Sequence, residues 1–172
     1  MTLTWHGDPD LKARTLKEAL EHQRADRYAQ RRHLALNNEG HWRGCPVSCL
    51  VAPHLAKSLG VSVSQLAAFN TNLTDWHELQ EHFLGIPYWL RQVEDGIFET
   101  LAPADAAAWP HRFLSAIPVG VWLRLDEYDL AEREALGLNE NLDSFGWDDP
   151  KERADHLVDW VTAPASGLAP PP

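Results

Sequence analysis

The residues best suited to chemistry lie in one short stretch that contains both cysteines of the chain, His41-Trp42-Arg43-Gly44-Cys45-Pro46-Val47-Ser48-Cys49. Pro46 suits the first position of a helix, because its missing N–H would have no partner there. We therefore expect Cys45 at the N-cap of a helix and Cys49 one turn later, on the same side. A thiol at a helix N-terminus meets the positive end of the helix dipole, which favours the reactive thiolate.

This placement predicts, as the leading hypothesis, a small thiol-dependent enzyme. Cys45 would be the nucleophilic or peroxidatic thiol, and Cys49 would resolve a sulfenic acid or disulfide formed on it. Either His41 or His54 would act as the base that raises the thiolate fraction. Arg43 would add positive charge near the thiols if the segment folds back on itself.

Two other interpretations of the cysteines stay open. In the first, both thiols are packed as small hydrophobic residues inside an α-helical protein-interaction or regulatory module. In the second, Cys45 and a histidine ligate haem or a metal, although the gap of three residues before Cys49 differs from the usual gap of two. On a continuous helix, Cβ atoms one turn apart lie about 5–6 Å from each other, whereas a disulfide needs about 3.8 Å. A disulfide here would therefore require Cys45 to leave the regular helix.

A second stretch, His77-Glu78-Leu79-Gln80-Glu81-His82, looks similar to a zinc-protease motif. That motif needs histidines four residues apart, so that both ligands share one helical face. The histidines here are five residues apart, which predicts a polar helix face instead. We therefore assign no metal ligands in this stretch, and the sequence does not identify a cofactor.

Length and composition limit the class of protein. A chain of 172 residues is long enough for one domain with a sizeable core, which we expect over residues 1–163, before a disordered tail rich in proline and alanine at 164–172. The formal net charge of −10 argues against nucleic acid and anionic membranes, and favours a small molecule or a protein as partner. The missing signal peptide, the missing transmembrane run and the two closely spaced cysteines predict a cytoplasmic protein.

Hydrophobic periodicity predicts a mostly α, single-domain irregular bundle of about seven to nine helices. The expected helices span approximately residues 8–36, 46–60 with an interruption or kink at Pro53, 62–69, 76–84, 87–101, 102–108, 109–117, 126–136 and 150–161. Prolines and glycines separate most of them. Pro53 is expected to interrupt or kink the helix begun at Pro46, and Trp109-Pro110 to start a new helix. The eight tryptophans are expected to pack in the core and between helices.

The end of the first expected helix carries a cluster of four arginines, Arg24, Arg27, Arg31 and Arg32. Basic residues near a helix C-terminus are favoured by the dipole, so we interpret the cluster as a solvated face rather than a phosphate-binding patch. Two histidines of this region, His22 and His33, are also expected to face solvent.

The best-patterned helix follows Ile86-Pro87, with an apolar stripe that contains Leu90, Val93, Ile97, Phe98 and Leu101. Glu94 and Asp95 are candidate general bases or ligands if they border the cysteines. The alternative is that both are solvated or paired with Arg91 and Arg112. Gly96, within the stripe, would permit another helix to approach closely.

Three blocks are similar to a family of bacterial and prophage hypothetical proteins, in which they occur in the same order. They are Trp42 to Cys49, Leu84-Gly85-Ile86-Pro87 through Glu94-Asp95-Gly96-Ile97-Phe98-Glu99, and Trp109-Pro110-His111-Arg112-Phe113-Leu114-Ser115-Ala116-Ile117-Pro118-Val119-Gly120. The resemblance covers roughly the central half of the chain. It implies no activity and assigns no site residue.

Overall fold

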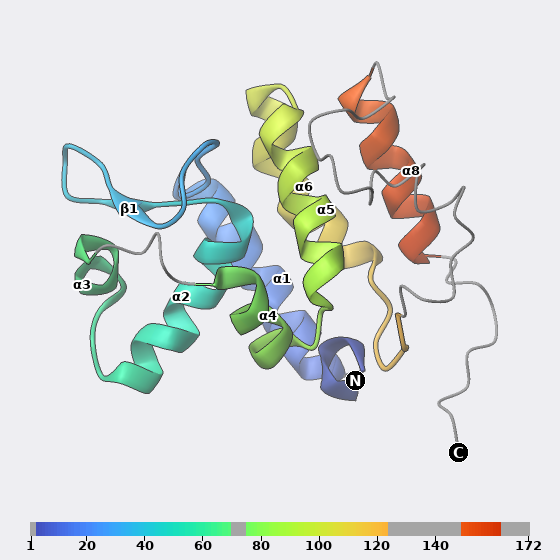
Figure 1. The fold of residues 1–172 in the computed structure, drawn as a ribbon, viewed down its shortest axis with the longest axis horizontal. Helices are drawn as coiled ribbons and strands as arrows, with labels where there is room; N and C mark the ends of the chain where they lie inside the picture. The colour runs from blue at the N-terminus through green and yellow to red at the C-terminus, as the bar shows by residue number, and fades with distance from the viewer. Residues whose placement is uncertain (1–2, 70–74, 124–148, 163–172) are drawn as a thin grey trace.

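Seven α-helices and a short hairpin make up the computed structural model, which describes residues 3–69, 75–123 and 149–162 (Figure 1). In chain order the elements are the 3-10 helix η1 (Thr4–Gly7), α1 (Pro9–Arg24), β1 (Ala35–Leu36), β2 (Trp42–Arg43), α2 (Pro46–Leu59), α3 (Val63–Ala68), α4 (Trp76–Leu84), α5 (Tyr88–Thr100), α6 (Pro103–Ala116) and α8 (Pro150–Thr162). The predicted mostly α fold is confirmed. The helix expected at 126–136 and the tail expected at 164–172 lie outside the described residues.

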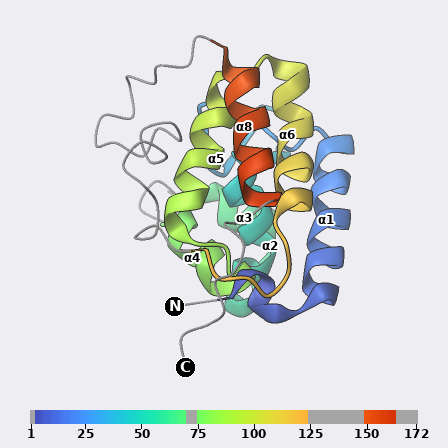
Figure 2. The same ribbon diagram turned by 90° about the vertical axis from the view of Figure 1, so that its right-hand side faces the viewer.

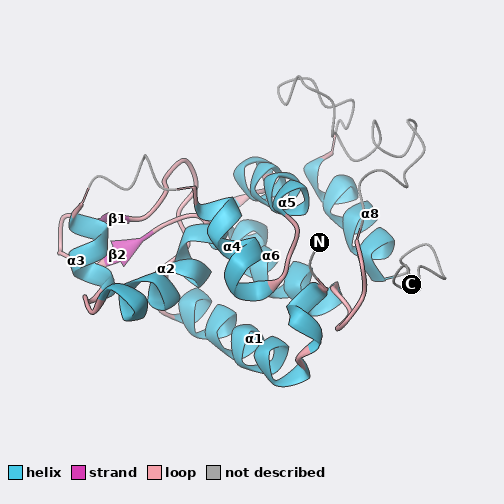
Figure 3. Ribbon diagram, turned by 60° about the horizontal axis from the view of Figure 1, so that its bottom comes forward, coloured by secondary structure: helices cyan, strands magenta, loops and turns pink. Residues whose placement is uncertain are grey.

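The helices α5 and α6 occupy the middle of the fold, and α1, α2, α4 and α8 pack around them. Helix α6 contacts α1, α5 and α8, while α2 contacts α1, α4 and α5. Figure 2 shows α1, α5, α6 and α8 running side by side, and Figure 3 shows the hairpin next to α3 at the opposite end from α8. Two hydrophobic clusters result, a larger one around α5, α6 and α8 and a smaller one among α2, α3 and α4.

Side-chain caps start several helices where the sequence predicts them. Asp8 accepts a hydrogen bond from the backbone N–H of Asp10 at 2.8 Å and begins α1. Ser62 and Gln65 form a reciprocal capping box at the start of α3, and Asp75 caps α4. Each cap satisfies a backbone N–H that the first helical turn leaves without a partner.

The first helix is shorter than predicted. It ends at Arg24, whereas the periodicity predicts a helix to about residue 36. The chain leaves the helix because Asp26 and Arg31 take left-handed backbone angles, with φ of 51° and 57°. The segment then pairs with the cysteine stretch, since the N–H of Ala29 donates to the carbonyl of Gly44 at 2.8 Å.

The hairpin that follows was not predicted. Residues 35–36 pair antiparallel with residues 42–43, so that Ala35 lies opposite Arg43 and Leu36 opposite Trp42. Strands of two residues are too short to produce an alternating hydrophobic pattern. The pairing depends on the turn that begins at Asn37, whose side chain accepts the N–H groups of Glu39 and His41 at 2.9 Å each.

Two prolines lie inside helices that we expected them to divide. Helix α2 continues through Pro53, and α6 continues through Pro110, so the predicted interruption at Pro53 and the predicted helix start at Pro110 are wrong. A proline inside a helix removes one hydrogen bond, that to the carbonyl four residues earlier. The tertiary packing of both helices outweighs this loss, because both prolines lie on strongly buried segments.

The N-terminal turn fits closely against the end of α4. Gly85 ends α4 in the left-handed conformation, with φ of +67°, and a Cβ there would lie 2.3 Å from the carbonyl oxygen of Leu3. Trp5 and His6 also have positive φ, of 57° and 51°. The Trp5 indole is fully buried and donates its N–H to the carbonyl of Ile117 at 3.1 Å. The start of the chain is thereby attached to the loop after α6.

Three tryptophans form part of the core as predicted, namely Trp5, Trp76 and Trp109. The prediction for His22 is wrong, because its side chain is buried and packs edge-on against Tyr28 and Trp42. Burial lowers the pKa of His22 to about 4, and the positive charge of Arg27 acts in the same direction. His22 is therefore a neutral core residue at neutral pH.

Helix α8 covers α5 at the position of Gly96. A Cβ on Gly96 would lie 3.9 Å from Nη1 of Arg153, an ordinary van der Waals contact, so this approach does not by itself require glycine. Burial lowers the pKa of Arg153 to about 10. None of the described helices combines the length and the apolar character that crossing a membrane requires.

Candidate functional site

Cys45 occupies the N-cap of α2 and Pro46 the first helical position, as predicted from the sequence. Cys49 follows within the first turns of the same helix. Both thiols are nonetheless inside the protein, with exposed fractions of 2% for Cys45 and 0% for Cys49. Both cysteines are free.

Each thiol donates a hydrogen bond to a neutral oxygen. Cys45 donates to the Ser48 hydroxyl at 3.5 Å, and Cys49 donates to the carbonyls of Gly44 at 3.4 Å and Arg27 at 3.5 Å. A thiol must carry its proton to donate in this way. The two cysteines thus have separate partners within the described residues.

Burial raises the pKa of both thiols well above the ordinary value. For Cys45 the negative charge of Asp95 raises the pKa further, whereas the hydrogen bond with Ser48 lowers it. For Cys49 the positive charges of Arg27 and Arg43 lower the pKa, but burial outweighs them. Both cysteines are therefore protonated at neutral pH in this conformation.

A buried charge pair on α5 lies next to the cysteines. Arg91 and Glu94 form an ion pair whose side chains are both 0% exposed. The guanidinium of Arg91 interacts electrostatically with Glu94, Asp95 and Cys45, and its Cζ lies 5.9 Å from the ring centroid of Phe113. Burial raises the pKa of Glu94 to about 8, although the charge of Arg91 opposes this shift.

The sequence predicted that Glu94 is either solvated or paired with an arginine, and the structure shows the pairing without the solvation. Glu94 is paired with Arg91, but neither side chain is solvated. Arg112, the other expected partner, instead pairs with Asp155 on the surface. The sequence carried a signal for the burial, because positions 91, 94, 98 and 101 have helical spacing and the last two are Phe98 and Leu101.

Tyr28 completes the group, and sequence reasoning missed its role. The loop after α1 brings the ring into the core, where its hydroxyl donates to the carbonyl of Ala19 at 3.1 Å. Burial raises the pKa of Tyr28 well above its ordinary value, and Cys49 and Glu94, when ionised, act in the same direction. We call this group the buried polar cluster; its members are Tyr28, Cys45, Ser48, Cys49, Arg91, Glu94 and Asp95.

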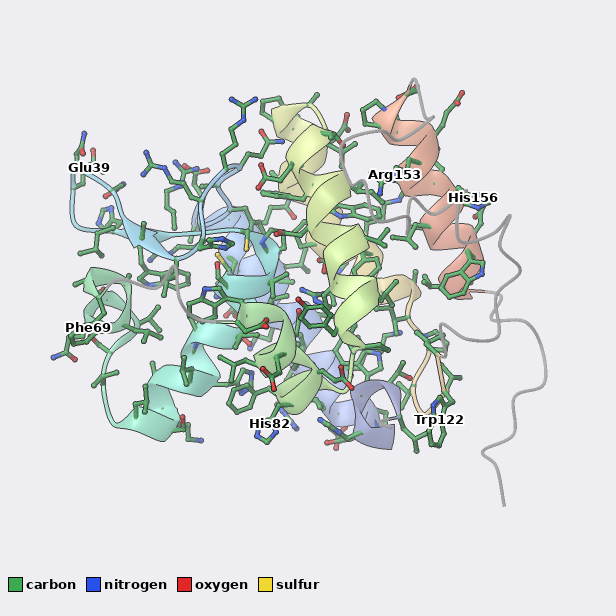
Figure 4. All side chains as sticks on the ribbon, in the orientation of Figure 1. Glu39, Phe69, His82, Trp122, Arg153 and His156 are labelled. Atoms are coloured by element: carbon green, nitrogen blue, oxygen red, sulfur yellow. The ribbon has the colours of Figure 1, made fainter. Side chains whose placement is uncertain are left out.

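The structure places both predicted histidine bases away from the thiols. His41 is exposed on the hairpin, where Nδ1 lies 3.5 Å from the carboxylate of Glu39 at the outer tip (Figure 4). His54 stacks on Phe83 of α4 with 5.3 Å between ring centroids, and burial lowers its pKa. Within the described residues, neither histidine has a hydrogen bond to Cys45 or Cys49.

Arg43 is the predicted residue that does lie near a thiol, because its charge affects Cys49. Its main contacts are structural. Nη2 donates to the carboxylate of Asp26 at 2.9 Å and to the carbonyl of Tyr28 at 3.0 Å, which holds the loop after α1 against the hairpin. Its Nε is buried and has no hydrogen-bond partner among the described residues.

A surface pocket of about 510 Å³ lies beside the buried polar cluster and shares Tyr28 with it. Its walls come from the loop after α1, the hairpin turn, the end of α5 and the first turn of α6. The lining residues are Asp26, Tyr28, Ala29, Gln30, Arg32, Asn37, Asn38, Arg43, Phe98, Pro103, Ala106 and Ala107. The cysteines do not line it.

Metal or haem ligation by Cys45 stays a prediction. Within residues 3–69, 75–123 and 149–162, no three His, Cys, Asp or Glu side chains are grouped so that they could hold a metal ion. No protein family matches the sequence, and no curated protein or solved structure matches the chain. The similarity of the three sequence blocks to bacterial and prophage proteins likewise stays a prediction.

Proposed function

We propose that this chain is an α-helical binding module in which both cysteines are structural. The observation that carries the proposal is the burial of Cys45 and Cys49, whose exposed fractions are 2% and 0%. A catalytic thiol needs to be accessible and ionised, whereas these thiols donate hydrogen bonds to neutral oxygens. Two free cysteines also support a reducing compartment such as the cytoplasm.

The test is the rate at which each cysteine is alkylated in the native protein across a range of pH, read by mass spectrometry. We expect neither Cys45 nor Cys49 to react at neutral pH until the protein is unfolded in guanidinium chloride. The single variants Cys45→Ser and Cys49→Ser serve as controls that assign each modification. The proposal is wrong if native Cys45 reacts faster than Cys49, with an apparent pKa below the free value of about 8.5.

A thiol-dependent enzyme is the second candidate, and the position of Cys45 favours it. The N-cap of α2 and the nearby guanidinium of Arg91 both stabilise a thiolate. In that mechanism the Cys45 thiolate attacks one oxygen of a peroxide and the O–O bond breaks. Cys45 becomes a sulfenic acid, and the other oxygen leaves as an alcohol or, from hydrogen peroxide, as water. The thiol of Cys49 then attacks that sulfur, and a disulfide forms with release of water. Consumption of hydrogen peroxide that depends on both cysteines would support this mechanism over the binding module.

A further inference from the structure

We propose that the pocket beside the buried polar cluster binds a small molecule with a phosphate or carboxylate group on a compact apolar body. The inference rests on the proposed binding function and names the class of ligand for it. A volume of about 510 Å³ suits such a molecule, since small-molecule sites typically measure about 300–1,000 Å³.

The lining combines apolar and polar side chains from different elements. The apolar side chains come from the end of α5 and the start of α6, and are those of Phe98, Pro103, Ala106 and Ala107. Amide side chains come from the loop after α1 and from the hairpin turn, namely Gln30, Asn37 and Asn38. Such a lining accommodates a ligand that is apolar at one end and polar at the other.

Positive charge exceeds negative charge among the lining residues, with Arg32 and Arg43 against Asp26, although the chain as a whole is acidic. Arg32 is exposed, and its side chain makes no hydrogen bond or ion pair with any described residue. Arg43 has a buried Nε without an acceptor among the described residues. Asp26, the acidic residue of the lining, already accepts a hydrogen bond from Arg43 at 2.9 Å. Guanidinium groups bind phosphate and carboxylate through paired hydrogen bonds.

The two helix ends at the pocket have the polarity that an anion requires. Pro103 is the first residue of α6, a helix of 14 residues whose N-cap, Ala102, provides no side-chain hydrogen bond. The backbone N–H groups of this turn are therefore left for a ligand or solvent, and the turn also carries the acidic side chain of Asp105. At the end of α5, Gln30 donates to the carbonyls of Phe98 and Leu101 at 2.7 and 2.8 Å, which covers the negative end.

The experiment is a titration of the ¹⁵N-labelled full chain, followed by NMR chemical shifts of backbone amides. The probes are phenyl phosphate, benzoate, inorganic phosphate and neutral phenol. We expect saturable shifts centred on Gln30, Asn38 and Ala107 with phenyl phosphate or benzoate, and the tighter of the two identifies the anionic group. Phenol and inorganic phosphate, which each lack one half of the ligand, should bind at least tenfold more weakly.

A pair of matched variants locates the site. Arg32→Gln should weaken binding of the better probe about tenfold, because it removes one charged donor. Arg24→Gln removes another exposed arginine, at the end of α1 and outside the pocket lining, and should leave binding unchanged. Both positions are exposed, so both variants should keep the native spectrum.

Three results would overturn the proposal. They are the absence of saturable shifts at the pocket with either organic anion, binding of inorganic phosphate as tight as that of phenyl phosphate, and an equal effect of Arg24→Gln and Arg32→Gln. These outcomes are separate from a failure of the proposed function. Rapid alkylation of native Cys45 would overturn the structural role of the cysteines while leaving the titration unaffected.

Discussion

The ion pair between Arg91 and Glu94 allows a sharp test of what burial of charge does in this fold. Both side chains are 0% exposed, so removing one partner leaves the other without its counter-charge in the core. Such a loss typically costs about 3–5 kcal/mol, whereas replacing both partners with apolar residues is often neutral or stabilising. We therefore expect Arg91→Met and Glu94→Leu each to lower the free energy of unfolding by about 3–5 kcal/mol. The double variant should be more stable than either single variant.

An exposed pair in the same protein provides the control. Arg112 and Asp155 connect α6 to α8, and their side chains are 43% and 51% exposed. Exposed pairs usually contribute less than about 1 kcal/mol, so the corresponding cycle with Arg112→Met and Asp155→Leu should show little coupling.

The assay is urea denaturation at pH 9, above the pKa of about 8 of Glu94, so that its carboxylate is charged. Unfolding is followed by circular dichroism and tryptophan fluorescence, and the coupling energy is taken from each double-mutant cycle. If the coupling of the buried pair is no larger than that of the exposed pair, the reasoning from burial is refuted. Should a single variant of the buried pair fail to fold, the double variant still decides the matter. It must fold with a stability close to that of the unmodified chain.

Two further predictions concern a buried histidine and a close backbone contact. Burial lowers the pKa of His22 to about 4, so between pH 6.5 and 4 the unfolded chain binds a proton at His22 that the folded chain does not bind. The free energy of unfolding therefore falls as the pH drops through this range, by about 3 kcal/mol in total. In urea denaturation across pH, His22→Gln should remove this loss, whereas His33→Gln, at an exposed site, should retain it. Gly60→Ala should lower the free energy of unfolding by about 1–2 kcal/mol, because alanine must adopt a left-handed backbone with φ of +69°, although no atom lies within 4 Å of the added Cβ. Gly85→Ala should lower the melting temperature further, because its Cβ would lie 2.3 Å from Leu3; equal losses would contradict the close contact.

Local signals predicted much of the fold. The starts of α1, α3 and α4 follow from short-range caps such as that of Asp75, and the end of α4 follows from Gly85. Interruption by proline was predicted wrongly at Pro53 and Pro110, because the rule counts the lost hydrogen bond and omits the packing that a buried helix gains. The hairpin and the loop after α1 depend on contacts between distant segments, which periodicity does not report.

The burial of Arg91 and Glu94 shows the same limit at the candidate site. A helix in contact with neighbours on one side has one apolar stripe, and charges beside the stripe face solvent. Helix α5 instead contacts α2 and α4 as well as α6 and α8. Its buried face is therefore wider than one stripe and includes Arg91 and Glu94 beside Phe98. Their helical spacing indicates this burial, whereas their charge is typical of a solvated face.

The cysteines illustrate how the relative size of two effects decides a chemical inference. The N-cap position of Cys45 was predicted correctly, and the helix dipole there does favour the thiolate. That effect is worth about 0.3–1 kcal/mol at an exposed site, less than one pKa unit of about 1.4 kcal/mol. Full burial shifts pKa values by as much as 3–5 units in the opposite direction. A motif at a helix N-terminus therefore predicts a reactive cysteine only where the thiol reaches solvent, and the packing of α2 against the loop after α1 keeps Cys45 and Cys49 from it.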